Sequence, residues 1–271
     1  MNTRNIPSTR EPIPIIGLGT WQTFDVSLTP PTRQRLTTVL ARYAEAGGRL
    51  IDSSPMYGRA EAVAGELIDA LPKPFVATKV WTRGRERGIA EMQRSAELLR
   101  TPVIDLMQIH NLLDWRTHLA TLRAWKDEGK IRYIGITHYH TGAFDDLEAI
   151  MRGEALDFVQ LPMSVELPDA EERLLPLAQS RGIAVLVNRP FEGGSLFADV
   201  QRKPLPQWAR EFDSESWSEL FLRWIVSHPA VTCVIPATGN PDHAAQNLRA
   251  GEGRMLTGGE RAKLRAYLRR K

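Results

Sequence analysis

The feature that most constrains the fold is the regular recurrence of short apolar runs rich in valine and isoleucine. The first seven runs begin 25 to 35 residues apart, and the eighth follows after 48 residues. One strand with its crossover helix takes about 30 residues, so each interval has room for one such unit. The eight runs begin at Ile15, Leu50, Phe75, Ile104, Arg132, Asp157, Ile183 and Val231.

The segments between the runs have the spacing of amphipathic helices. In the clearest case the apolar residues fall at i, i+3, i+4 and i+7, which places them on one helical face: Leu36, Val39, Leu40 and Tyr43. Gly129 and Gly182 stand where a glycine would end a helix just before the next strand. Strands and helices therefore alternate along the chain.

The runs do not alternate with polar residues, as expected for parallel strands that are buried on both faces. An open, doubly wound sheet would give the same local pattern, so periodicity alone leaves both architectures open. The spacing of eight runs, together with the polar residues at their ends, favours a closed barrel. We predict an α/β protein, a (β/α)8 TIM barrel that forms a single domain over residues 1–271.

The last interval is longer and contains many residues that break helices and strands. Between residues 188 and 213 these are Pro190, Gly193, Gly194, Pro204 and Pro206. A long loop at the C-terminal end of a strand is more often functional than not. We predict such a loop over residues 188–213, after the seventh strand.

Composition excludes several kinds of partner. The chain has 35 basic and 32 acidic residues, and its net charge of +3 is too dilute for a nucleic-acid surface. No apolar run approaches the roughly 18 residues of a membrane span. The single cysteine, Cys233, rules out an intrachain disulfide. We expect neither a nucleic-acid nor a membrane partner, and a cytoplasmic location by default, with periplasmic export as the alternative if a leader has been removed.

Polar side chains stand at or just past the ends of several runs. Asp52, Tyr57, Lys79 and His110 follow the second to fourth runs. In a closed barrel these ends converge on one face, where active sites are built from the loops. Each residue alone has a structural explanation, such as a strand-end charge or a hydrogen-bonded core histidine, but together they predict one site.

The four side chains complement one another chemically. A tyrosine is a poor acid near neutrality because its ordinary pKa is about 10, and a neighbouring cation lowers that pKa. Lys79 is a candidate for that cation, and Asp52 can pair with its ammonium group. His110 can donate a ring N–H to a carbonyl oxygen. The set predicts proton transfer at a carbonyl or alcohol oxygen, with no serine or cysteine nucleophile.

The chain resembles the aldo-keto reductases in several segments. Residues 50–58 (LIDSSPMYG), 77–79 (ATK) and 106–110 (LMQIH) contain aspartate, tyrosine, lysine and histidine in the order and spacing of that family's signature. The resemblance covers nearly the whole chain, continuing through residues 17–21 (GLGTW), Glu61, residues 129–135 (GKIRYIG), Gln160 and the stretch from Val234 to Asn247.

This resemblance implies a (β/α)8 barrel without a Rossmann domain that binds NADPH, less often NADH, across its C-terminal face. It implies that Tyr57 is the general acid when an aldehyde or ketone is reduced to an alcohol by hydride transfer. Lys79 and Asp52 would tune Tyr57, and His110 would orient the carbonyl. The loop over residues 188–213 would contact cofactor or substrate. The expected enzyme is an NADP-dependent alcohol dehydrogenase or carbonyl reductase.

The implied cofactor positions match the family unevenly. Gln160, Thr137 and His138 stand where the family holds the nicotinamide carboxamide, with Thr137 replacing a serine and His138 an asparagine. Asn188 replaces an aromatic ring that many members stack on the nicotinamide, and Phe191 is a candidate substitute. The other implied cofactor contacts are Gly19, Thr20, Trp21, Arg189, Thr238, His243, Gln246 and Asn247.

The adenosine end departs further from the family. Members specific for NADPH place a lysine and an arginine near the 2′-phosphate, where this chain has Ala237 and His243. A helix N-terminus near Pro241 still offers backbone N–H groups to an anion. We expect NADPH to bind, with weaker discrimination against NADH.

The expected substrate pocket is apolar and open, which suits small or varied aldehydes and ketones. For its tryptophans, packing in the core is the alternative explanation. We expect the protein to be a monomer. The predicted pocket residues are Trp21, Met56, Trp81, Leu112 and Trp115.

Two other functions remain open. His138 and His140 have an H-x-H spacing that, with His110 or Asp52, would suit the zinc site of a metal-dependent barrel hydrolase. We expect no bound metal. The second alternative is a non-catalytic, regulatory barrel that keeps the cofactor, against which the four intact site residues argue.

Overall fold

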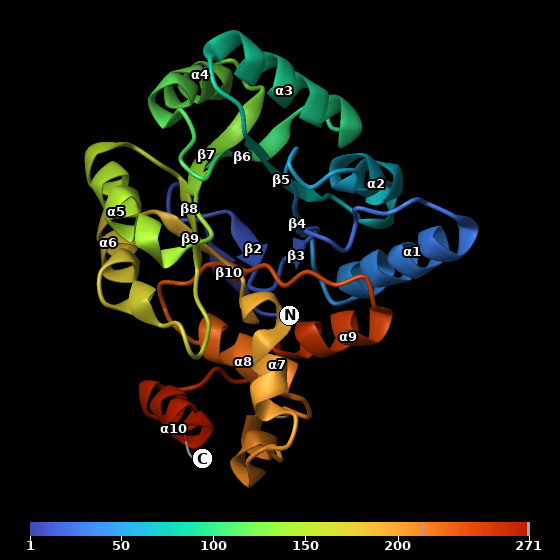
Figure 1. Ribbon diagram of the computed structural model, residues 1–271, viewed down its shortest axis with the longest axis vertical. Coiled ribbons are helices and arrows are strands. Elements are labelled where there is room, and N and C mark those ends of the chain that lie inside the picture. The colour runs from blue at the N-terminus through green and yellow to red at the C-terminus, as the bar shows by residue number, and fades with distance from the viewer. Residues whose placement is uncertain (213, 270–271) are drawn as a thin grey trace.

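The apolar runs form a ring of parallel strands surrounded by helices (Figure 1). The computed structural model describes residues 1–212 and 214–269, and within them eight strands pair in chain order from β3 to β10. Parallel bridges from Ile16 to Val234 and from Gly19 to Ala237 close the ring. The predicted barrel is confirmed. Its strands are β3 (Leu18–Gly19), β4 (Leu50–Asp52), β5 (Phe75–Val80), β6 (Ile104–His110), β7 (Ile131–Thr137), β8 (Phe158–Pro162), β9 (Ala184–Asn188) and β10 (Cys233–Val234).

The closure brings β3 and β10 very close together. A Cβ atom on Gly19 would lie 2.9 Å from the carbonyl oxygen of Ile235, which is closer than Cβ atoms normally approach backbone. Gly19 N donates to the carbonyl of Pro236 at 3.0 Å across the same seam. A glycine is therefore required at this point of the ring.

Helices cover the outside of the ring, as the periodicity predicts. In α1 the four residues of the predicted apolar face are all buried, and Gly129 and Gly182 adopt positive φ angles at the ends of α4 and α6. No helix in the described part of the chain is both long and apolar enough to span a membrane. The helices are α1 (Pro30–Glu45), α2 (Ala60–Leu67), α3 (Arg85–Leu98), α4 (Trp115–Asp127), α5 (Phe144–Gly153), α6 (Leu174–Arg181), α7 (Ser195–Val200), α8 (Trp217–Val226), α9 (Pro241–Arg249) and α10 (Gly258–Leu268).

A hairpin that the sequence analysis did not predict closes the N-terminal end of the barrel. Strands β1 (Thr3–Asn5) and β2 (Pro12–Pro14) pair antiparallel. Ile6 and Ile13 are fully buried in the cluster that fills the barrel interior, together with Phe75 and Tyr133. Their sequences, TRN and PIP, contain no run of valine and isoleucine, so periodicity does not mark them as strands. The hairpin closes the end opposite the strand ends that carry the predicted site.

The segment over residues 188–213 is more ordered than a loop. It contains the short helices η4 (Glu192–Gly194), α7 and η5 (Gln207–Phe212), and α7 buries Leu196 and Val200. Its prolines and glycines therefore mark joints between helical turns rather than an irregular connection. Asp213, the last residue of the predicted loop, lies outside the described residues.

Candidate active site

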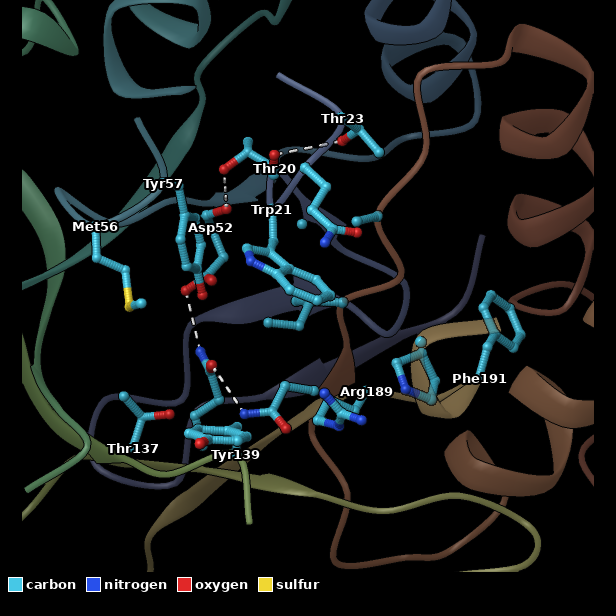
Figure 2. A pocket seen from close by; sticks show the side chains of 18 of the residues that line it. Thr20, Trp21, Thr23, Asp52, Met56, Tyr57, Thr137, Tyr139, Arg189 and Phe191 are labelled. Carbon is cyan, nitrogen blue, oxygen red and sulfur yellow. Dashed lines mark hydrogen bonds between the residues drawn. The ribbon is translucent and has the colours of Figure 1, made fainter. Parts of the chain in front are cut away.

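The C-terminal ends of the strands surround a cavity of about 710 Å³. Figure 2 shows side chains from several strand ends and loops around it, including Trp21, Met56 and Tyr57. The structure brings many predicted site residues to its wall: Gly19, Thr20, Trp21, Asp52, Met56, Tyr57, Trp81, His110, Thr137, Gln160, Asn188 and Arg189. The predicted convergence on one face is thus the observed arrangement.

A buried ion pair lies at the base of this site. Lys79, at 0% exposure on β5, places its Nζ 2.6 Å from Asp52 Oδ2 on the neighbouring strand β4. The same ammonium donates to the carbonyl of Ser53 at 2.6 Å. Burial alone would lower the pKa of Lys79, but the adjacent Asp52 and Tyr57 raise it, so the ammonium stays charged.

Two glutamines complete the hydrogen bonding of Asp52. Gln108 Nε2 and Gln160 Nε2 donate to Asp52 Oδ1 at 2.9 and 3.0 Å. Because both carboxylate oxygens accept hydrogen bonds, Asp52 is held rigidly against Lys79. Gln108 was not among the residues predicted from the sequence. It lies two residues before His110 on β6 and so shares its face, which is the signal that would have identified it.

Tyr57 lies on the loop after β4, above the ion pair. Lys79 Nζ is 5.1 Å from the centroid of the Tyr57 ring, and that ring meets His110 edge-to-face at 5.9 Å. Burial raises the pKa of Tyr57 above 10, although the charge of Lys79 opposes the rise. The charge of Lys79 lowers this pKa, as predicted, but burial has the larger effect, so the net shift of the Tyr57 pKa is upward.

A tight contact fixes the loop that carries Tyr57. Gly58 has φ +58°, and a Cβ atom there would lie 2.4 Å from the Asp25 carboxylate. Asp25 Oδ1 accepts a hydrogen bond from the backbone N–H of Arg59 at 2.9 Å. Gly58 therefore allows the loop after β3 to hold the Tyr57 loop in place.

His110 ends β6 and faces the cavity. Its Nδ1 lies 2.9 Å from Ser54 Oγ, and its ring is 6.3 Å from that of Trp81. Burial, with the charges of Lys79 and His138, lowers the pKa of His110 to about 3. The imidazole is therefore neutral at physiological pH and has one N–H to donate.

The residues implied for the nicotinamide form one hydrogen-bonded chain. Gln160 Nε2 donates to Gln108 Oε1 at 2.9 Å as well as to Asp52, so its two N–H groups are committed inside the protein. Asn188 Nδ2 donates to Gln160 Oε1 and to the carbonyl of His138, both at 3.2 Å. Asn188 Oδ1 is buried, and no described residue donates to it. This wall of the cavity therefore offers acceptors rather than donors.

His138 and the adenosine-side positions other than Ala237 lie outside the cavity wall. The His138 ring stacks on Tyr139 at 5.3 Å, and its Nδ1 accepts from the backbone of His140. The cavity lining reaches Ala237, whereas the other predicted positions on this side lie beyond it, on α9 or in the turn before it: Thr238, His243, Gln246 and Asn247.

The apolar part of the wall differs from the predicted one. Trp21, Met56 and Trp81 line the cavity and are each about 40% exposed, which excludes core packing for these tryptophans. Leu112 and Trp115 are not on the wall but pack partly buried against the core. The lining also contains aromatic residues from the segment after β7 and the segment after β9, including α7, that were not predicted for the substrate pocket: Tyr139, Phe191 and Phe197.

The described residues contain no group of three or more histidine, cysteine, aspartate or glutamate side chains that could hold a metal ion. In particular, His140 Nδ1 accepts a hydrogen bond from the backbone of Gly142 at 2.9 Å, and His138 Nδ1 accepts from the backbone of His140. The H-x-H pair thus forms part of a turn.

Comparison with known proteins agrees with this geometry. The model of the Aldo/keto reductase family matches residues 15–266. A 9,11-endoperoxide prostaglandin H2 reductase of Trypanosoma cruzi is 26% identical over 90% of this chain and 84% of its own. An NADH-specific methylglyoxal reductase of Escherichia coli is 28% identical over 72% of this chain and 69% of its own. The crystal structure of an aldo/keto reductase from Klebsiella pneumoniae with NADP and acetate superposes with a TM-score of 0.81, at 26% identity, covering 96% and 93% of the two chains.

Proposed function

The chain belongs to the aldo/keto reductase family, and we propose that it reduces aldehydes or ketones with NADPH, using Tyr57 as the proton donor. One observation carries the assignment of Tyr57. A fully buried ammonium, paired with a carboxylate, lies 5.1 Å from the ring of a tyrosine on the cavity wall. A lysine in that position stabilises the phenolate that proton donation leaves behind.

The protein's contribution to the reaction follows from four side chains. The Tyr57 hydroxyl gives its proton to the carbonyl oxygen as negative charge develops there, and Lys79 stabilises the resulting phenolate. Asp52 holds the ammonium in place. Neutral His110 donates its ring N–H to the same oxygen. When bound, the reduced nicotinamide supplies the hydride that the carbonyl carbon takes up.

The residues present fit a nicotinamide amide. Asn188 Oδ1 is a buried acceptor that no described residue satisfies, and Gln160 Oε1 accepts one bond and retains a second lone pair. The N–H groups of a carboxamide would satisfy both oxygens, and the hydroxyl of Thr137 lies on the same cavity wall. The Klebsiella relative was crystallised with NADP, which supports NADPH here, and the Escherichia coli relative is described as NADH-specific, so NADH is the alternative cofactor.

We assign to the segment after β9 the binding of the cofactor's phosphate groups. Arg189 lines the cavity, and no described residue forms an ion pair or hydrogen bond with its side chain. The segment that follows adds Pro190, Phe191, Gly193 and Gly194 to the same wall. A guanidinium without an internal partner at the cavity wall suits the cofactor pyrophosphate.

The apolar rim is assigned to the substrate. Trp21, Met56 and Trp81 expose about 40% of their surface, and Tyr139 exposes 51%, around the mouth of the cavity. Exposed aromatic surface of this kind is typical of a binding site rather than of a monomer's ordinary surface. It favours apolar aldehydes and ketones such as 4-nitrobenzaldehyde.

The test is to mix the protein with NADPH and 4-nitrobenzaldehyde and to follow cofactor absorbance and alcohol formation together. We expect one alcohol for each NADPH oxidised. Binding of NADPH without any oxidation, across a panel of aldehydes and ketones, would instead identify a non-catalytic, cofactor-binding barrel and refute the proposal.

A further inference from the structure

Ser54 is a buried hydroxyl that the reaction scheme above does not use. It follows β4 by two residues and has 0% exposure. Its Oγ lies 2.9 Å from His110 Nδ1. Its oxygen also accepts a hydrogen bond from the backbone N–H of Met56 at 3.3 Å. Ser54 therefore connects the loop that carries Tyr57 to the ring of His110.

The hydrogen bonding of Ser54 has only one fully satisfied arrangement. The Met56 N–H occupies one lone pair, and no other described residue accepts the hydroxyl proton. If Nδ1 of His110 carried the proton, the Ser54 O–H would be left buried without an acceptor. A buried polar group without a partner is strongly disfavoured. The Ser54 hydroxyl must therefore donate to His110 Nδ1.

Donation from Ser54 decides which tautomer of His110 is present. A neutral imidazole has one protonated and one bare nitrogen, and the hydrogen bond at one nitrogen fixes the proton on the other. With Nδ1 accepting, the proton is on Nε2. No described residue hydrogen-bonds Nε2, and His110 lines the cavity. The Nε2–H group is thus available to an oxygen in the cavity.

We propose that Ser54 is a positioning residue that holds His110 as the Nε2–H tautomer, so that the histidine presents a donor to the substrate carbonyl. The consequence for turnover rests on the proposed function, whereas the tautomer itself does not. In the other tautomer His110 would present a lone pair to the carbonyl oxygen, which would repel it. Ser54 thereby acts on the reaction without touching the substrate.

The protein offers an internal reference for this assignment. His118 Nε2 lies 2.7 Å from the carbonyl oxygen of Thr82, which only accepts hydrogen bonds, so His118 also has its proton on Nε2. The protein with ¹⁵N-labelled histidine, without cofactor, can be studied by long-range ¹H–¹⁵N correlation. This experiment separates protonated from bare ring nitrogens, and the spectrum of His110→Asn identifies the signals of His110.

In the wild type we expect His110 to show a protonated Nε2, as His118 does, and a bare Nδ1. A protonated Nδ1 in the wild type would overturn the proposal. This measurement needs no Ser54 variant and no turnover. Its outcome is therefore independent of the proposed function, which NADPH oxidation tests separately.

Variants then test the role of Ser54. Ser54→Ala removes the donor, so we expect His110 to lose the single Nε2–H pattern. We also expect kcat to fall about 10- to 100-fold, less than the roughly 10²–10³-fold that follows complete loss of an oxyanion donor. NADPH affinity should change little. Ser54→Thr keeps a hydroxyl and should recover both the tautomer and most of the lost rate.

Ser53→Ala is the matched control for the tautomer. Ser53 is the neighbouring buried serine, and its hydroxyl oxygen accepts from Thr20 Oγ1 at 3.0 Å and has no bond to His110. We expect its His110 spectrum to match the wild type. A Ser54→Ala protein that keeps the Nε2–H pattern and the wild-type kcat would refute the role of Ser54, as would an equal shift of the tautomer in Ser53→Ala.

Discussion

At the scale of single residues, the charges of the side chains at neutral pH determine which chemistry the site can perform. Burial raises the pKa of Tyr57 and lowers that of His110 to about 3, whereas the partners of Lys79 raise its pKa. The site near neutrality therefore holds one ammonium, one protonated tyrosine and one neutral histidine. That set suits donation of a proton to an oxygen.

These shifts predict the pH dependence of carbonyl reduction. Tyr57 must be protonated to donate, and its pKa lies above 10, so kcat/KM should stay flat through the neutral range. It should fall about tenfold per pH unit only above the pKa of Tyr57. His110 should give no inflection near its ordinary pKa of about 6.5. Initial rates between pH 5 and about 11 check this, and a step between about pH 6 and 8 would contradict it.

Part of this site can be read from the sequence, and part cannot. Asp52, Tyr57, Lys79 and His110 come together because strand ends converge in a closed barrel, and the spacing of the eight runs together with the polar residues at their ends predicts this. The direction of the Tyr57 pKa shift cannot be predicted from the sequence, because it depends on how deeply the loop buries the ring. The hydrogen bond from Ser54 to His110 depends on how the loop after β4 folds against the end of β6.

At the scale of elements, the two ends of the barrel have separate tasks. The β1–β2 hairpin fills the N-terminal end with Ile6 and Ile13 and presents Glu11, whose Oε2 accepts from the Tyr133 hydroxyl at 2.7 Å. The site occupies the opposite end. The long periodic helices were recognised from sequence because their patterns extend over several turns. Strands β1 and β2 contain no apolar run, and the six-residue α7 is too short to show a helical period.

Removal of apolar volume from the hairpin should affect stability and leave binding unchanged. Ile13 has 0% exposure, so Ile13→Ala should lower the free energy of unfolding by about 2–5 kcal/mol. NADPH affinity should stay the same, because the hairpin lies at the far end of the barrel. Urea unfolding and cofactor titration measure the two quantities. The control Asn5→Ala, at an exposed position on β1, should change stability by less than about 0.5 kcal/mol.

The residues of helix α9 and of the turn before it indicate limited discrimination between NADPH and NADH. Ala237 and the exposed His243 stand where the resemblance implies two cations near the 2′-phosphate. We expect the NADPH and NADH dissociation constants to differ by less than about 10³-fold. Quenching of tryptophan fluorescence gives both constants, and a larger preference would contradict this account.

A lysine restored at this position gives the complementary test. Ala237→Lys should tighten NADPH binding about tenfold, or about 1.4 kcal/mol, and leave NADH nearly unchanged. Asn5→Lys adds the same charge at the far end of the barrel and should change neither constant. Equal tightening of both cofactors in Ala237→Lys would show that the residue does not face the 2′-phosphate.

At the scale of the whole molecule, the closed ring gathers the ends of the repeated strands around the cavity that holds the site. The match of the family model over residues 15–266 and the bridges between β3 and β10 describe the same unit. The described residues gather no metal-binding group in it. Because the proposed mechanism uses Tyr57 and His110 rather than a metal ion to polarise the carbonyl, turnover should be unchanged by chelators, and metal analysis of the active protein should find no stoichiometric zinc. Loss of activity with EDTA and its return with zinc would favour a metal-dependent enzyme instead.

Carbonyl reduction, as proposed for this protein, depends on Tyr57 as the proton donor. The most direct measurement compares NADPH oxidation by 4-nitrobenzaldehyde in the wild type and in Tyr57→Phe, with cofactor affinity measured in both. We expect the substitution to lower kcat by at least about 10²-fold, while the NADPH dissociation constant stays within about twofold. Equal rates in the two proteins would contradict this role of Tyr57.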